Sequence, residues 1–96
     1  MNKKVVVIGK RGLLAKSMIN FLTKQEFKIS IFSPNQGPDN IDITEKKMLI
    51  HGLNNAKPDL IINCAGSVNL EFCEKYPEKA WHLNTISVCN IINWIQ

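Results

Sequence analysis

The order of apolar and polar residues predicts that short strands alternate with longer helices along this chain of 96 residues. Val5 to Ile8 are four consecutive β-branched residues that end at Gly9, a pattern typical of a strand buried on both faces. A second strand is expected over residues 27–32, where "FKISIF" alternates apolar and polar side chains. Leu60 to Ile62 form a third apolar run and a third predicted strand.

Two segments between these strands have the apolar period of a helix. The first begins at Gly12 and ends near Lys24. Its expected inner stripe comprises Leu14, Met18 and Leu22. The second follows Thr44, which we expect to cap the helix. Its expected inner face comprises Leu49 and Leu53.

A third helix is predicted to begin at Pro77, because proline is favoured in the first turn of a helix. Its expected inner face comprises Ala80, Asn84, Ser87, Val88, Ile91 and Ile95. Since strands that are apolar throughout alternate with helices, the chain is predicted to be a single α/β domain, residues 1–96, with a parallel sheet.

The segment that joins the first strand to the first helix has the spacing of a phosphate-binding turn. Gly9 would let the chain turn, Gly12 would let the backbone approach a pyrophosphate, and Ala15 would let the helix pack close to the strand. The unpaired amides at the start of that helix favour an anion. A tight turn with a purely structural role has the same spacing and remains the alternative.

The residues around this turn favour NADP(H) over NAD(H) as the cofactor. A carboxylate at the end of the second strand would bind the adenosine 2′-hydroxyl and repel a 2′-phosphate. The sequence there is Phe32-Ser33-Pro34, without an acidic residue. Arg11 lies directly before Gly12, and its guanidinium is suited to bind a 2′-phosphate through two hydrogen bonds.

Composition and charge argue against several other classes of function. The net charge is +4, but the cations are scattered and no row of aromatic residues accompanies them, so nucleic-acid binding is not expected. The cysteines, which lack C-x-x-C spacing, fit reduced cytosolic thiols and suggest no metal site; they are Cys64, Cys73 and Cys89. The apolar runs are too short for a signal peptide or a membrane span. We therefore expect a cytoplasmic protein.

Three further stretches resemble the dTDP-4-dehydrorhamnose reductase family of the extended short-chain dehydrogenases/reductases. The "IDIT" of residues 41–44 resembles the family's adenine-binding element, and the "KPDLIINCAG" of residues 57–66 resembles its fourth strand and the turn after it. The "CEKYPEKAWHLNTISVCNI" of residues 73–91 resembles its Glu-x-x-Pro-Glu-x-Ala…Asn…Asn-Ile run. The resemblance implies a Rossmann-type parallel sheet with flanking helices, NADPH as cofactor and a nucleotide sugar with a 4-keto group as substrate.

The same resemblance implies which residues would hold the cofactor. The residues assigned to the pyrophosphate are Gly9, Arg11, Gly12, Leu13 and Leu14. The residues assigned to the adenine are Asp42 and Ile43, and those assigned to the ribose and nicotinamide are Cys64, Ala65 and Gly66. Asn84 is implied to be a buried asparagine with a structural role. The chain departs from the family over residues 67–73, where Val68 replaces a hydroxyl residue and Phe72 replaces a lysine, so the particular sugar stays open.

The catalytic residues of such reductases have no counterpart in this sequence. The family uses a Ser or Thr and a Tyr-x-x-x-Lys, whereas Tyr76, the one tyrosine here, is followed four residues later by Ala80. We therefore assign Tyr76 to the start of a helix and assign no catalytic residue. In a 3-2-1-4-5 sheet the strand at 60–62 would also lack its outer neighbour, which predicts an exposed edge and self-association.

These features predict that the chain is the incomplete N-terminal half of an NAD(P)-binding domain and is inactive by itself. Two alternatives share the same cofactor half. One is a fragment of an NAD-dependent nucleotide-sugar epimerase or dehydratase. The other is a non-catalytic, NADP-binding regulatory module of the same family.

Overall fold

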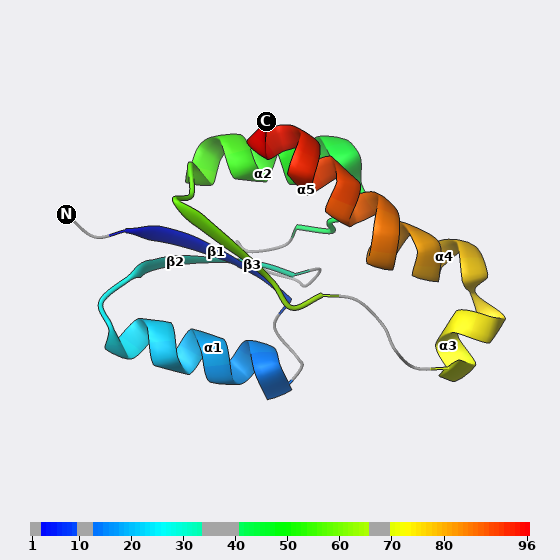
Figure 1. Cartoon of the computed structure of the whole chain (residues 1–96), viewed down its shortest axis with the longest axis horizontal. Coiled ribbons are helices and arrows are strands. Elements are labelled where there is room, and N and C mark those ends of the chain that lie inside the picture. Colours follow the sequence, from blue (N-terminus) through cyan, green and yellow to red (C-terminus); the bar gives the residue numbers. More distant parts are fainter. Residues whose placement is uncertain (1–2, 10–12, 34–40, 66–69) are drawn as a thin grey trace.

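The sheet has three parallel strands, with helices on both of its faces (Figure 1). The structure, a computed structural model, describes residues 3–9, 13–33, 41–65 and 70–96. The strands are β1 (Lys4–Ile8), β2 (Lys28–Phe32) and β3 (Leu60–Asn63), in the spatial order β2-β1-β3. The helices are α1 (Leu13–Lys24), α2 (Lys46–Ala56), α3 (Leu70–Lys75), α4 (Pro77–Trp81), the π-helix η1 (His82–Ile86) and α5 (Ser87–Ile95). The Rossmann-type fold predicted from the sequence is confirmed.

Strand β1 lies at the centre of the core. Its residues Val5 to Ile8 have exposed fractions of only 0–1% because β2, β3 and helices on both faces cover them. Side chains alternate between the two faces of a strand. Val5 and Val7 accordingly pack in one apolar cluster with Leu22 of α1. The other cluster comprises Val6, Ile8, Phe32, Ile43, Leu49, Leu53 and Ile91. The prediction that this strand is buried on both faces is confirmed.

Helix α1 ends at Lys24 as predicted, but the sequence-based prediction of its inner stripe was wrong at one position. Ala15 and Leu22 are buried, whereas Leu14 is exposed, with an exposed fraction of 65%. Ile19, one turn before Leu22, packs against the cluster beneath the helix. Because Ala15 is small, it brings α1 close to the sheet at this point and leaves Leu14 on the solvent side.

Helix α2 has the predicted inner face but a different start. Leu49 and Leu53 are fully buried. The N-cap position is occupied by Glu45, whose side chain makes no capping hydrogen bond. Thr44, the cap expected from the sequence, instead donates its N–H and its hydroxyl to Oδ1 of Asp42, at 3.0 and 2.6 Å. Thr44 is therefore satisfied within the preceding turn.

The last helical run begins at Pro77 as predicted and contains a wide turn that the sequence did not predict. Ala80, Ser87 and Ile91 are buried as expected. The expectation of a buried Asn84 was wrong, because this residue lies exposed in the middle of η1. Leu83, its neighbour in the same turn, packs against the core in its place. Ile95 is exposed at the end of α5, also contrary to expectation.

Asp59 holds β1 and β3 in register at the amino ends of both strands. Its backbone N–H donates to the carbonyl oxygen of Lys4 at 2.8 Å, and its Oδ2 accepts the N–H of Lys4 at 2.9 Å. The ladder then runs from the pair Val5–Leu60 to the pair Ile8–Asn63. This register brings the residues that follow the two strands, Gly9 and Cys64, next to each other.

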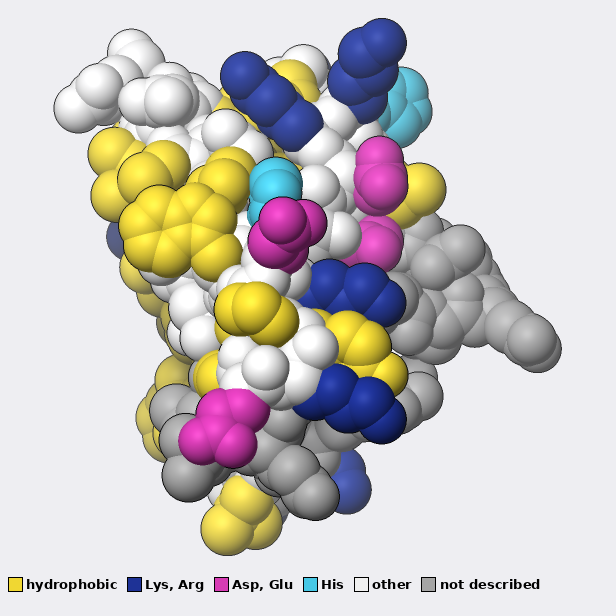
Figure 2. All heavy atoms as spheres, turned by 90° about the vertical axis from the view of Figure 1, so that its right-hand side faces the viewer, with side chains coloured by type: hydrophobic (Ala, Val, Ile, Leu, Met, Phe, Trp, Pro, Cys, Tyr) yellow, Lys and Arg dark blue, Asp and Glu magenta, His cyan; other side chains and the backbone are white. Residues whose placement is uncertain are grey.

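Strand β3 lies at one edge of the sheet formed by the described strands. It pairs with β1, and in the described ranges no other strand pairs with it. Leu60 has an exposed fraction of 50%, and an open groove of about 380 Å³ runs beside it. The groove is lined by Pro58, Asp59, Leu60, Ile61, Trp94 and Ile95. In Figure 2, hydrophobic side chains gather along one side of the surface, while charged ones spread over the rest of the described face.

Two kinds of feature are missing from the part of the chain that the structure describes. No helix there has the length and apolar character needed to cross a membrane. No group of three or more His, Cys, Asp or Glu residues there is arranged to hold a metal ion.

We expect Leu60→Lys to weaken self-association of the chain, because a lysine on an edge strand opposes pairing with a second edge. Sedimentation velocity over a series of protein concentrations measures this. Phe21→Lys is the matched control, since Phe21 has a similar exposed fraction of 56% but lies on α1. Identical association of wild type, Leu60→Lys and Phe21→Lys would contradict a role for this edge.

Candidate functional site

Gly9 makes the turn that leaves β1, and only glycine fits there without strain. Its φ is +100°, and its N–H donates to the carbonyl oxygen of Phe32 at 2.8 Å. A Cβ on Gly9 would lie 3.1 Å from the carbonyl carbon of Cys64 and 3.2 Å from the backbone nitrogen of Ala65. The conformation is one that residues with a side chain rarely adopt. The backbones that follow β1 and β3 are therefore in close contact.

This contact lies where ligands bind in open α/β sheets. The chain passes from β1 to β2 on one side of β1 and then returns to place β3 on its other side. The gap between the carboxyl ends of β1 and β3 is thus the switch point of the topology, the usual ligand-binding crevice of such sheets. The structure brings three of the predicted site residues together at this point: Gly9, Cys64 and Ala65.

The other residues predicted to contact the pyrophosphate are only partly described. Leu13 and Leu14 form the start of α1 and are exposed, so their side chains point away from the core. Arg11, Gly12 and Gly66 lie outside the described residues. Ala15, the last small residue of the predicted turn, is buried under α1 as the close packing of helix and strand requires.

An asparagine that the sequence analysis overlooked holds the turn after β3. The Oδ1 of Asn63 accepts the N–H of Ala65 at 3.0 Å, which closes a small side-chain turn directly beside Gly9. Asparagine at the end of a strand commonly makes this bond two residues on. That preference is the signal by which Asn63 could have been found.

The loop that carries Asp42 and Ile43 is anchored on both sides. Ile43 is buried, and its carbonyl oxygen lies 3.3 Å from the hydroxyl oxygen of Ser87. The same hydroxyl lies 2.7 Å from the carbonyl oxygen of His82, so Ser87 connects this loop to the wide turn η1. Asp42 is held by Thr44 through Oδ1 and by Met48, whose sulfur accepts the Asp42 N–H at 3.1 Å.

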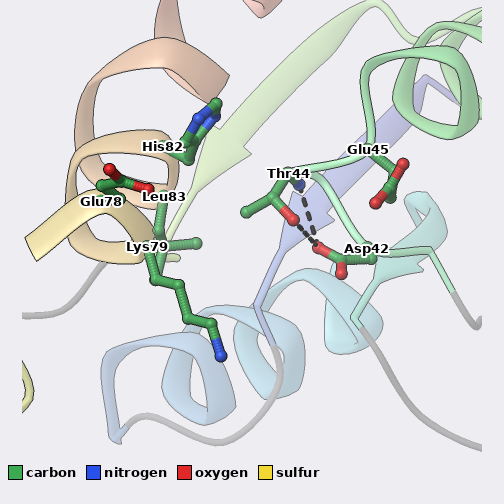
Figure 3. Close-up of a pocket in the computed structure, with 7 residues that line it drawn as sticks. All are labelled: Asp42, Thr44, Glu45, Glu78, Lys79, His82 and Leu83. Atoms are coloured by element: carbon green, nitrogen blue, oxygen red, sulfur yellow. Dashed lines mark hydrogen bonds between the residues drawn. The ribbon is translucent and has the colours of Figure 1, made fainter. Parts of the chain in front are cut away.

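A pocket of about 530 Å³ opens beside Asp42 (Figure 3). Asp42, Thr44 and Glu45 come from the loop before α2, and the opposite wall comes from α4 and η1. The residues of that wall are Glu78, Lys79, His82 and Leu83. They were not predicted as site residues. Their spacing was the available signal, because residues four apart lie on the same side of a helix.

Tyr76 lies at the entry to α4, as predicted. It occupies the N-cap position, directly before Pro77. The ammonium groups of Lys75 and Lys79 lie 5.5 and 4.9 Å from the centre of its ring. These are cation–π distances over the face of the ring. The contact holds the ammonium group of Lys79 over the Tyr76 ring, at the start of α4.

Comparison with known families decides the assignment. The family model of the RmlD substrate binding domain matches residues 3–96. The chain belongs to this family. The resemblance deduced from "IDIT", "KPDLIINCAG" and the run at 73–91 is thereby confirmed. No curated protein sequence is significantly similar to the chain.

Solved structures agree with membership of the RmlD substrate binding domain family. A dTDP-4-dehydrorhamnose reductase from Bacillus anthracis in complex with NADP is 26% identical, with a TM-score of 0.85. The match covers 100% of this chain and 33% of that one. A dTDP-4-dehydrorhamnose reductase from Clostridium acetobutylicum is 25% identical, with a TM-score of 0.77; the match covers 91% of this chain and 30% of that one.

The fold is also shared with more distant enzymes. A UDP-glucose 4-epimerase from Thermus thermophilus in complex with NAD is 13% identical, with a TM-score of 0.80; the match covers 94% of this chain and 32% of that one. At this identity the likeness concerns the fold alone. The chain thus spans about a third of the length of each of these three structures.

We expect Gly9→Ala to lower the free energy of unfolding by about 1–3 kcal/mol, because the new Cβ meets backbone atoms at a strained φ. Urea unfolding followed by circular dichroism measures the change. Gly52→Ala is the control. Its Cβ would lie 2.7 Å from Cδ1 of Ile41 and 3.1 Å from Cζ of Phe32, so it crowds side chains and not backbone, while its helix propensity improves by about 1 kcal/mol. Equal stability of Gly9→Ala and wild type would show that the turn can relax.

Proposed function

We propose that this chain is the NADP(H)-binding part of a reductase that acts on a nucleotide sugar and resembles dTDP-4-dehydrorhamnose reductase. The observation that carries the proposal is the Gly9 turn. It lies at the switch point of the sheet, it packs against Cys64 and Ala65, and α1 begins shortly after it. A Cβ on Gly9 would press against the backbone of Cys64 and Ala65, so the close approach of the two strand ends at this crevice requires glycine there.

The pyrophosphate would be held by the start of α1. Backbone N–H groups in the first turn of a helix have no partner within that helix, and its dipole favours negative charge there. α1 begins at Leu13 and has no acidic residue in its first turn that would oppose an anion. In the proposal Gly9, Arg11, Gly12, Leu13 and Leu14 surround the two phosphates.

The adenine would bind beside Asp42 and Ile43. Ile43 is fixed in the core, and Thr44 occupies Oδ1 of Asp42. Among the described residues, Oδ2 of Asp42 has no hydrogen-bonding partner, which suits it to accept the exocyclic amine of an adenine. The pocket of about 530 Å³ next to Asp42 supplies the space.

The proposed preference for NADP(H) rests on the end of β2. Ser33, the residue that follows this strand, is buried and carries no charge, so it does not repel a 2′-phosphate. Arg11 would supply the matching positive charge. Cys64, Ala65 and Gly66 would line the ribose and the nicotinamide.

When bound, NADPH would supply the hydride for reduction of the 4-keto carbon of the sugar. The described residues of this chain would hold and orient the cofactor, and in the proposal none of them is the acid for the carbonyl oxygen. Tyr76 does not serve as that acid in the proposal, because the residue four places on is Ala80 and not the lysine of a Tyr-x-x-x-Lys.

We expect the chain to bind NADPH more tightly than NADH, and Arg11→Ala to reduce the preference by roughly tenfold or more. A hydrogen bond to a charged group contributes about 1.5–3 kcal/mol, and the 2′-phosphate is the only difference between the two ligands. Fluorescence titration of both cofactors measures this. Lys24→Ala, at the far end of α1, removes the same charge and should leave the preference unchanged. An unchanged preference in Arg11→Ala would remove Arg11 from the site.

We expect the 96-residue chain alone to show no reduction of a nucleotide-activated 4-keto sugar. The measurement is the loss of nicotinamide absorbance with NADPH and the sugar present. Turnover that Tyr76→Phe abolishes would overturn the assignment of Tyr76 as a structural residue. Turnover that survives this change would show that another group in the chain supplies the proton.

A further inference from the structure

Met48 contacts the loop of the proposed adenine site through a hydrogen bond to Asp42. It lies in the first turn of α2, and its Sδ accepts the backbone N–H of Asp42 at 3.1 Å. Its exposed fraction is 39%, so the side chain is not needed to fill the core. Met48 does not line the pocket of about 530 Å³ beside Asp42. Its contact with the site therefore runs through Asp42 alone.

Three hydrogen bonds together fix the direction of the Asp42 carboxylate. The N–H and hydroxyl of Thr44 hold Oδ1, at 3.0 and 2.6 Å, and Met48 holds the backbone N–H. The bonds from Thr44 set the side chain relative to the backbone, and the bond to Met48 sets the backbone relative to α2. Without the sulfur, the amide of Asp42 would turn toward water, because this bond is at the exposed side of the loop.

The anchoring of this loop to α2 is otherwise mainly apolar, because Ile41 and Ile43 pack in the core cluster that contains Leu49 and Leu53. Glu45, the N-cap residue of α2, makes no side-chain capping bond. Its backbone N–H donates to the carbonyl oxygen of Asp42 at 3.0 Å, which closes the turn but leaves the Asp42 amide unfixed. Ile43 is anchored separately, through Ser87. Within a backbone that Ile41 and Ile43 anchor, the carboxylate of Asp42 is held by Thr44 and its N–H by Met48.

We propose that Met48 is a positioning residue for adenine recognition: its sulfur holds the Asp42 amide and so aims Oδ2 of the Asp42 carboxylate at the 6-amino group of the adenine. The proposal rests on the proposed function, since it requires that Asp42 meets the adenine. It predicts a specific defect. Loss of the sulfur reduces discrimination for the 6-amino group without reducing the binding of the rest of the cofactor.

The test compares NADPH with its deamino analogue, which has hypoxanthine in place of adenine and thus a 6-oxo group in place of the 6-amino group. The full chain is titrated with both ligands as wild type, Met48→Leu and Met48→Gln. Leucine has nearly the volume of methionine but no acceptor, and such swaps are well tolerated. Glutamine restores an acceptor near the position of the sulfur. Met18→Leu on α1 is the matched control for the loss of a methionine.

In the wild type we expect NADPH to bind more tightly than the deamino analogue. Met48→Leu should weaken NADPH binding by about three- to tenfold, the range for one neutral hydrogen bond, and change binding of the deamino analogue by less than twofold. Met48→Gln should recover part of the preference, and Met18→Leu should behave as wild type. Asp42→Ala should abolish the preference, and adding Met48→Leu to it should change nothing further, because coupled residues are not additive.

Each contrary outcome has a distinct meaning. If the wild-type chain binds neither ligand, or binds both equally, the adenine contact of the proposed function fails and this proposal fails with it. If the wild type discriminates and Met48→Leu discriminates to the same degree, the positioning role alone is overturned. If Met48→Leu weakens the binding of both ligands equally, the effect is a general structural one, and this also overturns the positioning role. Thermal melts of every variant establish that the comparison is made between folded proteins.

Discussion

The complete burial of β1 is the constraint on which the rest of the structure depends. Four consecutive β-branched residues, Val5 to Ile8, give up nearly all contact with water. They can do so only if both strand edges are paired and both faces are covered. β2 and β3 satisfy the edges, α1 covers Val5 and Val7, and α2 with α5 covers Val6 and Ile8. A strand enclosed in this way can meet a ligand only where it ends. The buried core and the position of the site are thus two results of one requirement.

Three segments that are distant in sequence meet around that end, and each is fixed by different chemistry. Gly9 relies on the absence of a side chain, the turn after β3 relies on the amide of Asn63, and the Asp42 loop relies on the hydroxyls of Thr44 and Ser87. Short polar side chains thus fix two of these three segments, and the lack of a side chain fixes the third. Charged side chains line both walls of the pocket, Asp42 and Glu45 on the loop before α2 and Glu78 and Lys79 on α4.

The sequence predicted the strands, their parallel arrangement and the residues of the innermost core, because these follow from periodicity. Leu49, Leu53 and Ile91 are buried where a helical period places them. The predictions failed where one small contact decides the orientation. Leu14 is exposed because its neighbour Ala15 makes the close approach to the sheet. Asn84 is exposed because the wide turn of η1 directs its neighbour Leu83 to the core. Of the predicted site, Gly9, Cys64 and Ala65 are brought together, whereas the roles of Met48 and Asn63 depend on tertiary contacts that no local pattern contains.

The bonds between Asp59 and Lys4 have a consequence for the opposite end of the sheet. In a parallel pair of strands the hydrogen bonds are evenly spaced, so the ladder itself distinguishes poorly between neighbouring alignments. A slip of one residue would preserve most of the ladder, yet it would place an inward-facing side chain outward and bring a different residue against Gly9. Asp59 penalises that slip because its carboxylate and its own amide both contact Lys4. The shape of the crevice at the carboxyl ends is therefore encoded in part by an aspartate at the amino end, one full strand length away from any group that would touch a ligand.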